Sequence, residues 1–224
     1  SAFVETSSKG HSDDTLKESL LAVLGDTHSN VAESVLLYPS PDVAVENAIS
    51  LVRTHQPDKA FRTVAVVGSD HGRTGMCRTA SGRPELQEGF GPMMAGFSHV
   101  PAGDLDAMGA VVDEQTACVL ISPVDLHNAG RPCDAEFLTG VREICDAREV
   151  LLVIDETQLC FGSSGHPLAL SAIADVRADI VVLSGGLLSG LSGGVVLASH
   201  RVTGQAIGDN GDRYPLQAAV IAET

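Results

Sequence analysis

The sequence predicts an α/β fold with a mostly parallel central sheet that is covered by helices on both faces. Runs rich in Val, Leu and Ile, typical of strands buried on both faces, alternate with segments that carry apolar residues at helical spacing. Hydrophobic residues make up 44% of the 224 residues, and there is no Trp and only 4% aromatic residues. The core must therefore be built mainly from aliphatic side chains.

The first residues are polar and precede a segment with a helical pattern. We expect residues 1–12 to form a disordered lead and residues 13–224 to form a single domain. Within 13–25, leucines recur on one helical face and a glycine ends the pattern, which predicts a helix.

A short strand followed directly by a helix start is predicted in "SVLLYPS" (34–40). Ser40 suits the N-cap position, Pro41 suits the first helical position, and Asp42 complements the positive end of the helix dipole. The apolar face of this helix is predicted to consist of Val45, Ala48, Ile49 and Val52.

The remaining strands are predicted from apolar runs. They lie at 63–69, 117–122, 149–155, 179–184 and 193–199. Asp134 is expected to cap a helix that carries Phe137, Leu138, Val141 and Ile144 on one face. Residues 70–97 are Gly-rich and contain three arginines, and we expect them to be a long irregular segment.

The charge balance excludes some classes of partner. Fourteen Lys and Arg against 29 Asp and Glu give a net charge of −15, which repels nucleic acid and anionic lipid. Residues 180–199 carry no charge, but nine of them are Gly or Ser, so we do not expect a membrane span. The five cysteines show no metal-binding spacing, and a reducing cytoplasm is the simplest location.

Polar residues gather where the predicted strands end, and ligands of open parallel sheets bind at the carboxyl ends of the strands. The candidate site residues at these ends are Asp70, His71, Ser122, Asp125, His127, Asp155, Glu156 and Gly185. From their position alone, Asp155 and Glu156 are either cofactor contacts or strand-end residues that hold neighbouring loops.

Four segments in order resemble class III aminotransferases that use pyridoxal phosphate, most closely the acetylornithine and ornithine type. They are "FRTVAVVGSDHGRTG", "GFGPMMAGFSHVPAGDLDAM", "FLTGVREICDAREVLLVIDETQLCFGSSG" and "ADIVVLSGGLLSGLSGG". The resemblance implies the large domain of the fold-type I enzymes, with the small domain largely absent. It also implies a homodimer formed through the large domain.

Some of the family's functional residues have matches in this chain. Asp155 matches the aspartate that pairs with the pyridine nitrogen, and Gln158 matches the glutamine that follows it. His71 and Gly72 match a His-Gly pair that follows an aromatic residue stacked on the cofactor.

Other matches are lost. Asp70 stands in place of the stacking aromatic, Pro41 and Asp42 in place of the Gly-Thr/Ser that begins the phosphate-binding helix, and Ser122 in place of a glutamate. Gly185 stands in place of the lysine that forms the Schiff base, and Lys59 is the last lysine of the chain.

These losses lead to a prediction with two alternatives. We expect a pseudoenzyme that has lost the cofactor and acts as a structural or regulatory homodimer, because glycine cannot form an aldimine and Asp42 would repel a phosphate. One alternative is a transaminase with residual pyridoxal phosphate-dependent activity. The other is a small-ligand or metal-binding protein that uses Asp70, Asp125 and His127 in the vacated pocket.

Overall fold

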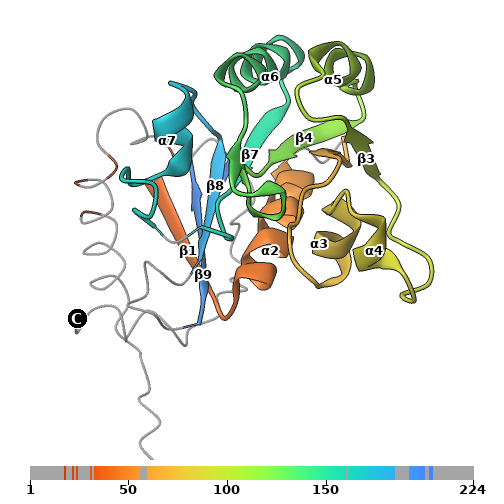
Figure 1. The fold of residues 1–224 in the computed structure, drawn as a ribbon, viewed down its shortest axis with the longest axis horizontal. Helices are drawn as coiled ribbons and strands as arrows, with labels where there is room; N and C mark the ends of the chain where they lie inside the picture. The colour runs from red at the N-terminus through yellow and green to blue at the C-terminus, as the bar shows by residue number, and fades with distance from the viewer. Residues whose placement is uncertain are drawn as a thin grey trace, which may run out of the picture.

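The computed structural model describes residues 33–55, 60–159, 161–184, 192–199, 202 and 203, together with residues 18, 22, 24 and 31. In this part of the chain, seven strands form one sheet in the order β1-β9-β8-β7-β4-β2-β3 (Figure 1). Their bounds are β1 Ser34–Tyr38, β2 Arg62–Val66, β3 Phe97–Val100, β4 Thr116–Ile121, β7 Leu151–Asp155, β8 Ile180–Ser184 and β9 Gly194–Ala198.

Five neighbouring strands of this sheet pair in parallel, and the two pairings at the other side of the sheet are antiparallel. β3, β2, β4, β7 and β8 pair in parallel, whereas β9 runs antiparallel to β8 and β1 antiparallel to β9. The predicted α/β class with a mostly parallel central sheet is confirmed. The strands predicted from apolar runs are present, with boundaries that differ by a few residues.

Helices cover both faces of the sheet (Figure 1). The helices are α2 Pro41–His55, α3 Gly75–Ala80, α4 Pro84–Gln87, α5 Leu105–Val111, α6 Ala135–Arg148 and α7 Ala169–Ile173. Side chains along β7 alternate between two cores: Leu152 and Ile154 pack in the core that contains α5, α6 and α7 residues, while Leu151 and Val153 pack in the core that contains α2 and α3 residues. This alternation is the period of two that a strand imposes on its side chains.

Helix α2 begins as the sequence predicts. The Val43 N–H donates to Ser40 Oγ at 3.2 Å, so Ser40 is the N-cap, and Pro41 is the first helical residue. The predicted apolar face is fully buried, at Val45, Ala48, Ile49 and Val52. At α6, Asp134 is the N-cap residue as predicted, but its side chain makes no capping hydrogen bond.

The expectation of a wholly irregular segment over 70–97 is wrong. This segment contains the short helices α3 and α4, and β3 begins at its end. Neither helix is long enough to show a periodic pattern. Helix α3 is joined to α2 by a tertiary contact, since the Met76 N–H in its first turn donates to Glu46 Oε1 at 2.8 Å.

An antiparallel hairpin follows β4 and was not predicted. It consists of β5 Val124–Asp125 and β6 Arg131–Pro132, with the 3-10 helix η2 Leu126–Asn128 between them.

Several sequence predictions fall largely outside the described residues. Gly185 is among them, as is the lead over residues 1–12. Of the helix predicted at 13–25, only residues 18, 22 and 24 are described, and all three are helical. The helices of the described residues are all too short or too polar to cross a membrane.

Candidate functional site

The predicted site lies where β2, β4 and β7 end, and these three strands are neighbours in the sheet. Asp70 and His71 follow β2, Ser122 follows β4, and Asp155 is the last residue of β7. The fold therefore brings most of the candidate residues to one edge, which is the edge where open α/β sheets bind ligands.

The centre of the site is a buried pair formed by Asp155 and His71. His71 Nδ1 lies 2.7 Å from Asp155 Oδ2, and both side chains are 0% exposed. Because a carboxylate can only accept, Nδ1 carries the proton of this bond. Asp155 Oδ1 accepts from the Thr157 N–H at 2.9 Å. Within the described residues, His71 Nε2 is buried and has no hydrogen-bond partner.

Asp70 is the centre of a second cluster. Its side chain is 5% exposed and accepts hydrogen bonds from both terminal nitrogens of the Arg73 guanidinium. Its carboxylate also accepts from His127 Nε2 at 2.9 Å and from the Gly72 N–H at 3.1 Å, and Arg83 lies 3.8 Å away. Burial raises the pKa of Asp70, but the hydrogen bonds and the charge of Arg73 outweigh burial and leave the pKa below its usual value.

Asp42 links the first turn of α2 to the loop after β2. Its Oδ2 accepts from the Arg73 backbone N–H at 2.9 Å. Gly72 has φ +117°, and a Cβ built on it would lie 2.6 Å from Asp42 Oδ1, so only glycine fits beneath this carboxylate. The helix start and the loop are thus held together by Asp42.

The other candidate residues have local structural partners. Both carboxylate oxygens of Glu156 accept from N–H groups at the start of α7, those of Ala169 and Leu170, each at 2.8 Å. Burial raises the pKa of Glu156. Ser122 Oγ donates to the Val124 carbonyl at 3.1 Å, and Gln158 donates to the Asp70 carbonyl. Of the two interpretations of Glu156, the strand-end residue that holds a neighbouring segment agrees with these contacts.

The residues proposed for a metal site do not form one. Both carboxylate oxygens of Asp70 accept hydrogen bonds from Arg73. Asp125 Oδ1 accepts from the backbone N–H of His127 at 2.9 Å. Across the described part of the chain, no three His, Cys, Asp or Glu side chains come together as metal ligands.

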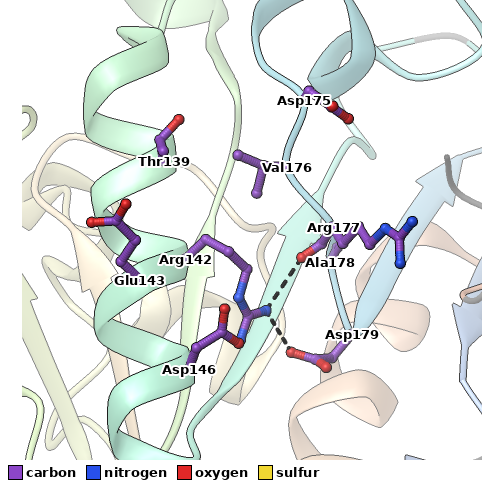
Figure 2. A pocket seen from close by; sticks show the side chains of 9 residues that line it. All are labelled: Thr139, Arg142, Glu143, Asp146, Asp175, Val176, Arg177, Ala178 and Asp179. Carbon is purple, nitrogen blue, oxygen red and sulfur yellow. Dashed lines mark hydrogen bonds and ion pairs between the residues drawn. The ribbon is translucent and has the colours of Figure 1, made fainter.

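A cavity of about 510 Å³ lies away from this site (Figure 2). It lies between α6 and the segment that leads into β8, and therefore at the amino end of that strand. Arg142 crosses it and pairs with Asp179 at 2.8 Å and Asp146 at 2.7 Å. Its lining residues are Thr139, Arg142, Glu143, Asp146, Asp175, Val176, Arg177, Ala178 and Asp179.

Sequence reasoning missed the arginines that bind Asp70. The spacing of Asp70 and Arg73 is the available signal, because residues three apart can form an ion pair. Arg83 and His127 reach Asp70 only through the tertiary fold.

The fold is that of aminotransferases. An ornithine aminotransferase from Toxoplasma gondii superimposes with a TM-score of 0.83 at 21% identity, covering 97% of this chain and 52% of that chain. A transaminase from the marine bacterium Virgibacillus gives a TM-score of 0.83, also at 21% identity, with 98% and 53% covered.

Sequence comparison identifies the family. The family model of class-III aminotransferases matches residues 8–224. The acetylornithine aminotransferase of Rhodobacter capsulatus is 36% identical over 200 residues, which are 86% of this chain and 51% of that protein. The corresponding protein of Methanopyrus kandleri is 36% identical over 183 residues, 80% of this chain and 46% of that protein. The chain belongs to the class III aminotransferase family and spans about half the length of the curated relatives it matches.

The expectation that the chain binds no cofactor is contradicted by these findings. The family and its structural neighbours are aminotransferases, and a second structure of the Toxoplasma gondii ornithine aminotransferase has pyridoxal phosphate partially occupying its active site. Membership of this family favours binding of pyridoxal phosphate. The prediction relied on lost residues, of which Gly185 lies outside the described part of the chain.

Proposed function

We propose that this chain binds pyridoxal phosphate at the carboxyl ends of β2, β4 and β7 and serves amino-group transfer of the acetylornithine or ornithine type. The observation that carries the proposal is the buried Asp155–His71 pair. Asp155 matches the family's pyridine-binding aspartate and sits at the sheet edge where ligands of this architecture bind.

The carboxylate at the end of β7 has the chemistry that the pyridine nitrogen of the cofactor requires. Pyridoxal phosphate supplies an electron sink when it is bound, and a carboxylate beside its pyridine nitrogen favours the protonated ring. Asp155 can take this role because each carboxylate oxygen has two lone pairs and each has one partner here. His71 fixes the orientation of Asp155 and offsets its charge.

The residues at the other end of the site do not fit as well. Pro41 and Asp42 stand at the start of α2, where the family match places the phosphate, and Gly185 provides no amine. The proposed role therefore rests on cofactor binding through Asp155.

Equilibrium dialysis with pyridoxal phosphate tests the proposal. We expect the wild-type chain to bind the cofactor and Asp155→Asn to bind it at least about tenfold more weakly, since one charge partner is lost. Asp106→Asn, an exposed first-turn residue of α5, is the matched control and should bind like wild type. Equal binding by wild type and Asp155→Asn would remove the basis of the proposal.

A second candidate is a family member that does not turn over substrate and acts as a homodimer. It is favoured by glycine at position 185 and by the absence of any lysine after Lys59. Turnover of N-acetylornithine or ornithine with 2-oxoglutarate separates the two candidates, and light scattering measures the oligomer.

Four cysteines of the described part of the chain have free thiols, which supports a reducing compartment such as the cytoplasm. They are Cys77, Cys118, Cys133 and Cys145.

A further inference from the structure

The N-terminus of α2 has few hydrogen-bond donors left for a ligand. A helix start binds an anion through the N–H groups that have no partner within the helix. Of the first three helical residues, Pro41 has no N–H, and the Val43 N–H donates to Ser40 Oγ at 3.2 Å. Two of these three residues therefore offer no free N–H to a ligand phosphate.

The negative charge that this helix start favours is also supplied by the chain. Asp42 lies in the first turn of α2, where a carboxylate is stabilised by the helix dipole. Its Oδ2 is bonded to the Arg73 N–H, and its Oδ1 lies against Gly72, so the carboxylate is held over the loop after β2. A phosphate placed at the same helix start would meet this like charge.

The two ends of the site thus differ in what they can still bind. At the ring end, His71 Nε2 is buried and lacks a hydrogen-bond partner among the described residues. At the α2 end, the guanidinium of Arg73 is committed to Asp70 and its backbone N–H to Asp42. The ring end therefore has a nitrogen, His71 Nε2, that can still form a hydrogen bond. At the α2 end, the carboxylate of Asp42 already provides the negative charge.

We infer that Asp42 is a selectivity-determining residue that makes the site favour pyridoxal or pyridoxamine, which lack the phosphate, over the phosphate ester. The inference rests on the proposed function, since it concerns the same ligand class at the same site. Pyridoxal phosphate remains a ligand. Its phosphate adds little to the affinity, because the carboxylate of Asp42 lies at the helix start and repels a second anion there.

The test is equilibrium dialysis of wild type and three variants against pyridoxal and pyridoxal phosphate separately, with detection by ligand absorbance. Asp42→Asn removes the charge and keeps an acceptor for the Arg73 N–H. The double variant Pro41→Gly with Asp42→Thr restores the family's residue types at the helix start. Asp106→Asn removes a first-turn charge from α5, away from the site. Thermal unfolding checks that each variant is folded.

We expect wild type and Asp106→Asn to bind pyridoxal at least as tightly as pyridoxal phosphate. Asp42→Asn should raise affinity for the phosphate ester by about tenfold, and the double variant by more, with pyridoxal affinity unchanged. A wild type that binds the phosphate ester far more tightly than pyridoxal, or an Asp42→Asn variant with unchanged preference, would overturn the inference and leave the proposed function intact. If wild type binds neither ligand, the proposed function fails and the inference fails with it.

Discussion

The ring end of the site and the α2 end lie at the same sheet edge but are organised in opposite ways. At the ring end, Asp155 and His71 form a wholly buried pair. At the α2 end, Asp42 accepts from the Arg73 backbone N–H, and the Arg73 guanidinium donates to Asp70 in the loop after β2. Among the described residues, the ring end keeps a buried imidazole nitrogen without a partner, whereas the carboxylates near α2 are bonded to Arg73.

This difference shows how buried carboxylates can be accommodated at a binding edge. A buried carboxylate that has no partner is costly, so an aspartate at such a position is stable only where donors reach it. Asp70 accepts from three residues in two segments, Gly72 and Arg73 in one and His127 in the other. These contacts form a connected network.

The largest expected effect is at the ring end. Asp155→Ala leaves His71 buried without its partner and removes the acceptor for the Thr157 N–H. We expect the free energy of unfolding to fall by about 3 kcal/mol, as for other broken buried pairs. Urea denaturation measures this, with Asp106→Ala as the exposed control. A loss below about 1 kcal/mol would show that the pair contributes little to the stability of this edge.

A smaller effect is expected where Asp42 meets the loop after β2. Gly72→Ala places a methyl group 2.6 Å from Asp42 Oδ1 on a residue with φ +117°. Gly103→Ala is a matched control, because Gly103 has φ +80° and a Cβ there meets nothing within 4 Å. We expect both variants to lose about 1 kcal/mol from backbone strain and Gly72→Ala to lose about 1–2 kcal/mol more.

Equal losses in the two glycine variants would mean that Asp42 moves freely away from the loop. In that case the contact between Asp42 and Gly72 would not hold the α2 end of the site in place. Thermal and urea unfolding of the two variants side by side measure the difference.

The smallest effect concerns the pH dependence of the Asp70 cluster. The folded-state pKa of Asp70 is lowered, so its stabilising contribution is present above the ordinary Asp pKa of about 3.9 and is lost as pH falls through the lower folded value. We expect Asp70→Asn to be less stable than wild type by about 1–2 kcal/mol at pH 7 and to approach wild type below about pH 4.

Urea unfolding between pH 3 and pH 7 measures this change. The more exposed Asp113, which pairs with Arg62 at 2.7 Å, provides a comparison because its pKa is also lowered by its arginine. A stability difference between wild type and Asp70→Asn that does not change with pH would contradict the assignment of an ionised Asp70.

Much of the fold could be predicted from local patterns in the sequence. The apolar runs of β4, β7, β8 and β9 are strands because their aliphatic side chains are buried on both faces, and a short run of this kind is recognisable without its neighbours. Helix α2 could be placed to its first residue, because Ser40 and Pro41 carry the signal for a helix start. Family membership also followed from the order of short segments.

The partners within the site were decided by the tertiary structure. His71 and Asp155 are 84 residues apart, and His127 and Asp70 are 57 apart, so their contacts depend on which strands become neighbours and on where each strand ends. Helix α3 is likewise joined by its first turn to Glu46 of another helix. The sequence by itself determined most strands of the sheet and the residue types at their ends, because burial and capping are local. Only the folded chain decided which charges meet, because hydrogen bonds form between side chains that the topology brings together.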